Sequence, residues 1–396
     1  MKILTVSDVF FPRVNGVSTS IATFHEEYRK RGHEAVLYAP TYANGFDTEA
    51  GIGAEANGSH GEVRRLPSRR IPFDPEDRMM SGRRLLTQAD ALTRERFDVL
   101  HIQTPFIAHR VGVPLARRLG IPVVETYHTY FEQYLYHYIP FLPKALMRRI
   151  ARSFSRRQCN QVDGVIVPSV AMLEVLRAYG VRSRMEKIPT GLRLEEFRAG
   201  NGMAFKKRHG IDPDRKTLVH IGRVAFEKNI DFLLHVLDEV RGKVPNILLI
   251  IAGEGPAESH LHGLTQKLGL QDHVLFVGYQ DRASALLDCY RAGDLFVFAS
   301  KTETQGLVLL EAMALGVPVV SLAAMGTKDI LTPQQGAVIA EEQTEDFARK
   351  IVQLLDDEPR RQQMARDAVD YAATWSAGQM AERALDFYHR LAAPTS

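Results

Sequence analysis

Short runs of Val, Ile and Leu alternate with longer amphipathic runs along the whole chain of 396 residues. Strands that are apolar on both faces are typical of parallel sheets, which helices cover on both sides. The alternation therefore predicts an α/β fold of the doubly wound kind. The expected strands span residues 2–9, 34–39, 63–66, 99–102, 123–125, 164–167, 185–188, 218–221, 247–252, 274–277, 295–299, 317–321 and 337–339.

The pattern falls into two similar halves, and the chain is long enough for two domains. Three glycines interrupt it in IPTGLRLEEFRAGNG, so we expect one domain over 1–190 and another over 200–372. The last helical pattern, in 377–396, has no strand after it and is free to pack on the first domain. Ligands of open parallel sheets bind beyond the carboxyl ends of the strands. Two Rossmann-like domains would thus face each other across a central cleft.

Composition excludes several classes of protein. The formal charge of +3 is too small to indicate nucleic acid as a partner without a concentrated patch. Only Cys159 and Cys289 are present, without metal-ligand spacing, which favours reduced thiols in the cytosol. The first apolar run breaks at Asp8 and lacks a cleavage site, so we expect a strand and not a signal peptide. Since no apolar run approaches the ~20 residues of a membrane span, we expect a soluble or peripheral protein. The polar segment 42–61 is expected to be a surface loop.

The stretch ETQGLVLLE places Glu303 and Glu311 eight positions apart around Gly306. A helix starting near Gly306 would present free amides at Gly306 and Leu307 to an anion. Eight helical residues span about 12 Å, which exceeds the roughly 5–10 Å between the two carboxylates of a glycoside hydrolase. The spacing suits a nucleotide sugar, with one carboxylate on the hexose and the other on the ribose diol. The alternative is that Glu303 is a solvated loop residue and Glu311 pairs with a buried arginine.

The stretch GRVAFEKN follows the strand expected at 218–221 and carries two cations. Arg223 and Lys228 would leave the same strand end and neutralise a diphosphate, stabilising the charge of a departing nucleotide. The alternative is an ordinary loop with surface cations.

Three further strand ends offer candidate residues. SDVFFPRVNGVSTSI contains Gly16, where a phosphate or sugar could approach the backbone closely. IAGEGP, with Gly253, reads as a tight turn that is either functional or structural. ETYHT places His128 just after the strand at 123–125, where it could bind a sugar hydroxyl or guide an acceptor. A lone histidine is more often structural.

Residues 141–157 combine basic and apolar side chains at helical spacing in FLPKALMRRIARSFSRR. Such a helix can lie in an anionic membrane surface, although a solvated basic face over the core is the simpler interpretation. The DxD at 212–214 reads as a turn, and no cluster has metal-ligand spacing. We therefore expect chemistry without metal or cofactor, in which Arg223, Lys228 and helix amides replace a divalent ion.

The whole chain resembles the retaining family-4 glycosyltransferases with the GT-B fold. The motifs that carry the resemblance occur in the family's order: SDVFFPRVNGVSTSI, ETYHT, GRVAFEKN and the Glu-x7-Glu stretch ETQGLVLLE. Within that family, ETQGL and YHTYFEQYLYHYIP look most like the bacterial diacylglycerol glucosyltransferases. ETQG replaces the EGFG of many relatives, which bears on the choice of donor or acceptor.

The resemblance implies a role for each candidate. Glu303 would hold donor-sugar hydroxyls and Glu311 the ribose, and the C-terminal helix would fold back onto the N-terminal, acceptor-binding domain. His128 would lie beside the donor sugar, and Tyr279 near the nucleobase. The residues expected to act in catalysis are His128, Arg223, Lys228 and Glu303, and those expected to bind the donor are Gly16, Gly253, Tyr279, Gly306, Leu307 and Glu311.

The expected activity is transfer of glucose from UDP-glucose to a membrane lipid such as diacylglycerol, at the inner face of the cell membrane. A GDP-mannose-dependent mannosyltransferase acting on a lipid or saccharide is the alternative, followed by a nucleotide-sugar epimerase and a non-catalytic binder. No well-placed carboxylate nucleophile is evident, which favours attack of the acceptor on the face that the nucleotide leaves.

Overall fold

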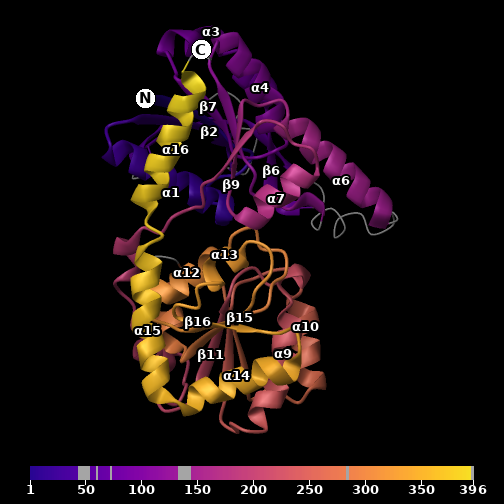
Figure 1. Ribbon diagram of the computed structural model, residues 1–396, viewed down its shortest axis with the longest axis vertical. Helices are drawn as coiled ribbons and strands as arrows, with labels where there is room; N and C mark the ends of the chain where they lie inside the picture. The colour runs from indigo at the N-terminus through magenta and orange to yellow at the C-terminus, as the bar shows by residue number, and fades with distance from the viewer. Residues whose placement is uncertain (43–53, 59–60, 72–73, 133–143, 282–284, 394–396) are drawn as a thin grey trace. The chain divides into compact units, whose positions relative to one another are not determined.

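The computed structural model describes residues 1–42, 54–58, 61–71, 74–132, 144–281 and 285–393, and it divides into two compact units (Figure 1). The first unit is Met1–Gly191 with Ala377–Ser396, and the second is Leu192–Ser376. The boundaries predicted from the sequence are residues 190, 200 and 372. Each unit is an α/β structure built on its own largely parallel sheet.

The sheet of the first unit has the strand order β10-β9-β8-β7-β1-β2-β4-β3 among the described residues. Every neighbouring pair is parallel except β3 with β4. The chain runs from β1 to β2 on one side and later returns to β7 on the other, so the order reverses between β1 and β7. The strands are β1 (Lys2–Val6), β2 (Glu34–Pro40), β3 (Ala54–Gly58), β4 (Gly61–Leu66), β7 (Val99–Ile102), β8 (Val123–Thr126), β9 (Gly164–Val167) and β10 (Arg184–Lys187).

The C-terminal helix α16 (Ala377–Ala392) belongs to this first unit although it follows the second in sequence. It packs beside α1 (Gly16–Lys30), where the hydroxyls of Tyr28 and Tyr388 lie 2.9 Å apart. Tyr388 and its apolar neighbours on α16 share one buried cluster with residues of β1, β7, β8 and β9. The other helices of the unit are α2 (Gly82–Leu86), α3 (Ala89–Glu95), α4 (Ile107–Leu119), α6 (Lys144–Cys159) and α7 (Val170–Ala178).

The second unit has a sheet of order β13-β12-β11-β14-β15-β16, with all neighbouring strands parallel. This order places the reversal of a doubly wound fold between β11 and β14. The strands are β11 (Thr217–Ile221), β12 (Leu248–Ala252), β13 (Val274–Gly278), β14 (Leu295–Phe298), β15 (Val319–Leu322) and β16 (Ala337–Ala340).

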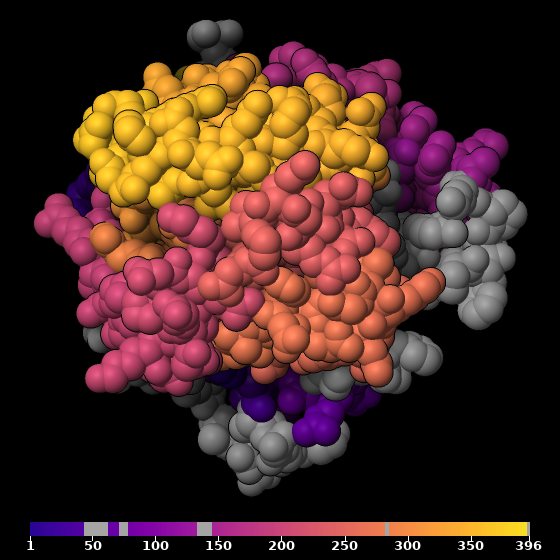
Figure 2. Space-filling model, turned by 90° about the horizontal axis from the view of Figure 1, so that it is seen from below, coloured from indigo at the N-terminus to yellow at the C-terminus, as the bar shows by residue number. Residues whose placement is uncertain are grey.

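Helices cover both faces of this second sheet. Successive residues of one strand enter different cores, since Leu218 packs on one side and Val219 on the other. The helix α14 packs against both α9 and α15, and Figure 2 shows the C-terminal part of this unit, in yellow, at the surface. The helices are α8 (Gly202–Arg208), α9 (Ile230–Arg241), α10 (Glu258–Lys267), α11 (Ala285–Ala292), α12 (Leu307–Ala314), α13 (Thr327–Leu331), α14 (Thr344–Asp356) and α15 (Glu358–Ala373).

The predicted fold class is confirmed, and two expectations about local structure are wrong. β1 ends at Val6 and not at residue 9, because the Ser7 hydroxyl donates to the carbonyl of Val9 at 2.6 Å and starts a turn. The predicted loop 42–61 contains β3, which pairs antiparallel with β4; residues 43–53 and 59–60 lie outside the described residues. A small antiparallel pair, β5 (Ser68–Ile71) with β6 (Asp74–Met80), was not predicted from its polar composition.

Candidate active site

The loops that follow β11 and β14 flank the point where the strand order of the second sheet reverses. They are joined by hydrogen bonds from Ser300 Oγ to the carbonyl of Glu227 at 3.2 Å and from Asn229 Nδ2 to the carbonyl of Ala299 at 3.3 Å. Doubly wound folds bind ligands at this position. The predicted stretches GRVAFEKN and ETQGLVLLE therefore meet at one sheet edge.

Two of the predicted site residues contact each other directly in this edge. The ammonium of Lys228 forms an ion pair with the carboxylate of Glu303, and both side chains are partly buried. Arg223, about one-third exposed, lies 4.0 Å from the carboxylate of Glu227. Lys228 and Arg223 thus stand on the loop after β11, with the carboxylate of Glu303 across from them on the loop after β14.

The helix α12 begins at Leu307, four residues after Glu303. Gly306 precedes the helix with φ of 97°, a conformation that favours glycine, and a Cβ there would lie 3.1 Å from Cγ2 of Thr327. As a glycine, Gly306 has no side chain with which to cap this N-terminus. The first amides of a helix need an external acceptor, so an anion can bind at Gly306 and Leu307.

Glu311 lies one and a half turns further along α12, with only 2% of its surface exposed. The hydroxyl of Tyr290, on α11, donates a hydrogen bond of 2.7 Å to its Oε2 atom. Burying a carboxylate is costly unless hydrogen bonds compensate. Tyr290 therefore helps to keep a charged group within an otherwise apolar helix, where the sequence offered a buried arginine as the alternative partner.

The loops after β12 and β13 complete the same edge of the sheet. Gly253 has φ of 131°, and a Cβ at this position would lie 1.9 Å from the carbonyl oxygen of Gly222, so only glycine fits. Its amide donates to the carbonyl of Gly278 at 2.8 Å. Tyr279 follows directly, with 56% of its surface exposed. An exposed aromatic ring at a strand end is suited to stacking on a nucleobase.

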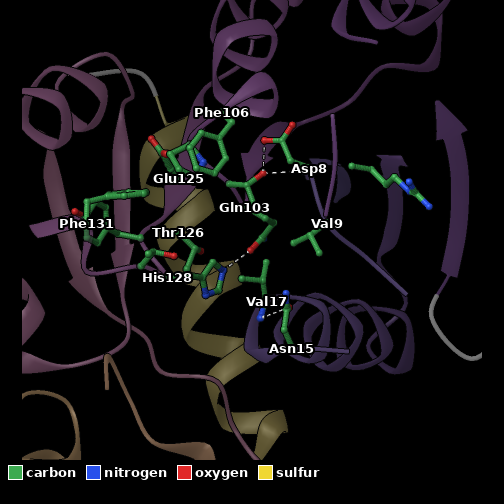
Figure 3. Close-up of a pocket in the computed structure, with 15 residues that line it drawn as sticks. Asp8, Val9, Asn15, Val17, Gln103, Phe106, Glu125, Thr126, His128 and Phe131 are labelled. Atoms are coloured by element: carbon green, nitrogen blue, oxygen red, sulfur yellow. Dashed lines mark hydrogen bonds between the residues drawn. The ribbon is translucent and has the colours of Figure 1, made fainter. Parts of the chain in front are cut away.

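The first unit contains a separate cavity of about 140 Å³ at the point where its own strand order reverses (Figure 3). Its walls come from the segments after β1, β7 and β8 and from the start of α1. Asp8 lies in its wall, where its carboxylate accepts hydrogen bonds from Thr104 Oγ1 at 2.8 Å and from the amide of Ala108 at 3.1 Å. Burial raises the pKa of Asp8 to about 6, although these hydrogen bonds act in the opposite direction.

His128 also lines this cavity, with its Nε2 atom 2.9 Å from Oε1 of Gln103 (Figure 3). Because burial disfavours the imidazolium, the pKa of His128 falls to about 4. The ring is therefore neutral at pH 7. It can bind a hydroxyl group but brings no charge to the cavity.

Gly16 is exposed at the start of α1, with open space where a side chain would begin. The next two amides, of Val17 and Ser18, already donate to Oδ1 of Asn15 at 3.0 and 2.9 Å. An anion at this helix end would have to compete with Asn15. The open space at Gly16 permits close approach of a ligand, and the predicted role in donor binding stays a prediction.

Sequence comparisons match both units to known families. Residues 14–196 match the model described as "Glycosyltransferase Family 4", and residues 203–370 match "Glycosyl transferases group 1". The chain is 33% identical to an alpha-monoglucosyldiacylglycerol synthase of Streptococcus pneumoniae over 330 residues, covering 81% of this chain and 71% of that protein. The chain belongs to the family-4 glycosyltransferases. This glycosyltransferase is also 30% identical to a GDP-mannose-dependent alpha-mannosyltransferase of Mycobacterium tuberculosis, over 86% of this chain and 83% of that protein.

Solved structures place the glycosyltransferase in the GT-B fold. Anabaena HepE in complex with UDP is similar with a TM-score of 0.76 at 18% identity, covering 98% of this chain and all of that one. Sucrose-phosphate synthase from Thermosynechococcus elongatus gives a TM-score of 0.77 at 20% identity, covering 99% of each chain. At these identities the likeness concerns the fold alone.

Most of the predicted site residues lie together at one edge of the second unit. His128 and Gly16 lie in the first unit. Sequence reasoning missed Tyr290, Gln103 and the burial of Asp8, and the only signal for Asp8 was its interruption of an apolar strand. The residues gathered in the second unit are Arg223, Lys228, Gly253, Tyr279, Glu303, Gly306, Leu307 and Glu311.

The described residues of the glycosyltransferase contain no group of three or more His, Cys, Asp or Glu that could hold a metal ion. The DxD sequence forms the expected turn, with the amide of Asp214 donating to Oδ1 of Asp212 at 2.9 Å. Chemistry without metal stays a prediction. Among the described residues, no helix is both long and apolar enough to span a bilayer.

Proposed function

We propose that this glycosyltransferase moves glucose from UDP-glucose to a membrane lipid such as diacylglycerol, with retention of the anomeric configuration. The observation that carries the proposal is the cluster at the β11–β14 edge. There Lys228 pairs with Glu303, α12 begins four residues further on behind Gly306, and Glu311 follows along the same helix. In this arrangement the cations and helix amides can bind a diphosphate. The two carboxylates, one on either side, can bind hydroxyl groups.

The proposed mechanism uses these groups to stabilise the leaving nucleotide. The bond from the sugar C1 to the diphosphate oxygen breaks, and a bond from C1 to the acceptor oxygen forms on the same face. The acceptor proton passes to the leaving diphosphate, whose charge Arg223, Lys228 and the amides of Gly306 and Leu307 stabilise. Glu303 holds the sugar hydroxyls and Glu311 the ribose.

The first unit is proposed to bind the acceptor in its cavity. Besides Asp8, Arg78 and Glu125, the described walls carry neutral hydrogen-bonding groups that suit the hydroxyl groups of a glycerol or sugar headgroup. They are Gln103, Thr104 and Thr126. The likeness to alpha-monoglucosyldiacylglycerol synthases from Streptococcus pneumoniae and from Acholeplasma laidlawii supports a lipid acceptor.

We also propose that α6 holds the enzyme at an anionic membrane surface, on the cytoplasmic side. Leu146 and Ile150 lie one turn apart on this helix and are 45% and 46% exposed. Exposed arginines flank them, although Arg152 and Arg148 also contact the carboxylate of Glu132 at 3.0 and 3.6 Å. Apolar side chains beside arginines can enter the headgroup region of anionic lipids. Residues 133–143, part of the aromatic and basic stretch noted in the sequence, lie outside the described residues.

A GDP-mannose-dependent mannosyltransferase is the second candidate, because the Mycobacterium tuberculosis relative of that name shares 30% identity over most of both chains. Nucleotide release separates the candidates. Purified full chain is incubated with UDP-glucose or GDP-mannose, with diacylglycerol vesicles or without, and in parallel with EDTA. We expect UDP release that requires diacylglycerol, persists in EDTA and yields an α-glucoside by NMR.

Each other outcome contradicts a part of the proposal. GDP release with lipid favours the mannosyltransferase, and loss of donor without acceptor favours a hydrolase or epimerase. A β-linked product or a trapped glycosyl-enzyme excludes attack on the leaving face with retention. Absence of turnover with every donor indicates a binding protein.

A further inference from the structure

A chain of buried and partly buried hydrogen bonds runs from the cavity of the first unit to the C-terminal helix. His128 Nε2 lies 2.9 Å from Gln103 Oε1, and Gln103 Nε2 lies 3.1 Å from His101 Nδ1. The hydroxyl of Tyr388, on α16, lies 2.7 Å from the same Nδ1 atom of His101. Tyr28 of α1 ends the chain, with its hydroxyl 2.9 Å from that of Tyr388. The cavity is thus connected to a helix that follows the whole second unit in sequence.

The hydrogen-bond partners of the two histidines bear on which ring nitrogen carries the proton. Gln103 Oε1 is an acceptor, so Nε2 of His128 must carry the proton and its Nδ1 atom is an acceptor. In the assignment proposed below, the Tyr388 hydroxyl donates to Nδ1 of His101, and the Nε2 atom of that ring donates to Thr126 Oγ1 at 2.7 Å. Which ring nitrogen of a histidine is protonated depends on the hydrogen bond that the other makes. These partners therefore imply that the His128 ring is neutral and carries its proton on Nε2.

Burial keeps both imidazoles uncharged, lowering the pKa of His101 to about 3 and that of His128 to about 4. The titratable groups near His101 are His25 of α1, which opposes its protonation, and the phenols of Tyr28 and Tyr388. Asp8, Arg78 and Glu125 line the cavity together with His128. None of these groups has to change its protonation state at pH 7 for the chain of hydrogen bonds to persist.

We propose that Gln103 and, through His101, Tyr388 are positioning residues that hold His128 as its Nε2-protonated tautomer. The C-terminal helix α16 is therefore part of the site in the first unit and not only a covering of its sheet. In this tautomer Nδ1 of His128 is a hydrogen-bond acceptor. The consequence for turnover rests on the proposed function, whereas the tautomer and its dependence on Tyr388 do not.

Nitrogen NMR of the full chain labelled with ¹⁵N-histidine tests the tautomer directly. The protein has 14 histidines, and a His128→Asn variant identifies the signals of that residue. We expect the Nε2-protonated form in the wild type from pH 5.5 to 8.5. Tyr388→Phe should change the signals of His101 and His128, whereas the matched control Tyr371→Phe, on α15 of the second unit, should leave them unchanged. An Nδ1-protonated or cationic His128 at pH 7, or unchanged signals in Tyr388→Phe, would overturn the proposal.

Kinetics then separate positioning from a purely structural role. We expect Tyr388→Phe and Gln103→Leu to lower kcat by about 10-fold, with the donor KM within about twofold of wild type. Gln103→Glu keeps the acceptor but adds a charge that raises the His128 pKa, so its activity should fall as the pH drops below 7. Wild-type kcat in Tyr388→Phe, or a wild-type pH profile in Gln103→Glu, overturns the positioning role. If no donor supports turnover in wild type, the proposed function fails, and NMR still decides the tautomer.

Discussion

The hydroxyl of Tyr290 donates a hydrogen bond of 2.7 Å to Oε2 of Glu311, joining α11 to α12 inside the core of the second unit. Both side chains are almost fully buried. A carboxylate at such a place gains little from solvent, so its orientation depends on protein partners. The hydrogen bond from Tyr290 explains how a glutamate is accommodated within the apolar run LVLLEAMAL.

Removal of this hydroxyl tests whether Glu311 must be oriented for donor binding. Tyr290→Phe keeps the ring but removes the donor, so we expect nucleotide affinity to fall by about 5–10-fold and stability by about 1 kcal/mol. Calorimetric titration with UDP and GDP measures the affinity, and denaturant unfolding measures the stability. Tyr371→Phe, on α15, is the control. Unchanged affinity with reduced stability would show that the bond is only structural.

Loss of the Lys228 charge should lower the rate of transfer. We expect Lys228→Ala to reduce turnover by ~10²-fold or more, because the departing diphosphate loses a stabilising cation. Lys301→Ala is the matched control, since Lys301 forms an exposed ion pair with Glu342 and such pairs contribute little. The rate of nucleotide release under saturating donor is the measurement. Near-wild-type turnover in Lys228→Ala would remove this residue from the catalytic machinery.

The raised pKa of Asp8 predicts a pH-dependent stability. Its pKa is about 6 in the folded protein against 3.8 when solvated, so the folded state binds the proton more tightly. The resulting stabilisation is complete below pH 3.8 and is lost as the pH rises through 6, by up to about 3 kcal/mol. Denaturant unfolding of wild type and Asp8→Asn from pH 4 to 7 measures it. The wild type should lose stability relative to the variant over this range, and parallel curves would be inconsistent with a raised pKa.

The exposed apolar side chains of α6 should contribute to vesicle binding. We expect the double substitution Leu146→Ser and Ile150→Ser to reduce co-sedimentation with anionic vesicles by about 10-fold or more. Binding of the wild type should weaken as salt rises from 0.05 to about 0.5 M, because ions screen the arginines. Met203→Ser removes a similarly exposed apolar side chain from α8 and serves as the control. Equal binding by all three proteins would exclude α6 as the membrane contact.

The fold could be predicted from the sequence because the buried strands and the helices differ in periodicity. All the expected strands of both sheets are present. The strands that were missed lie at 54–58, 68–71 and 74–80, where Arg, Glu and Asp are common and the apolar signal is weak. β3 pairs with β4, and local composition does not reveal such a pairing.

The candidate site was predictable where function depends on neighbouring residues of one loop. Arg223 with Lys228, and Glu303 with Glu311, lie close in sequence, and the carboxyl ends of parallel strands bring their loops together. Partners from distant elements left no such signal. Tyr388 contacts His101 across 287 positions, so only the folded chain connects the C-terminal helix to His128.

The most direct test of the account is whether Glu311 binds the ribose of a nucleoside diphosphate. Calorimetric titration first identifies which of the two nucleotides, UDP or GDP, binds more tightly. The affinity of that nucleotide is then compared with the affinity of its 2′,3′-dideoxy analogue, in wild type and in Glu311→Gln. We predict that wild type prefers the ribonucleotide by about 10-fold or more and that Glu311→Gln loses this preference. An equal preference in both proteins, or no nucleotide binding by the wild type, would contradict the account.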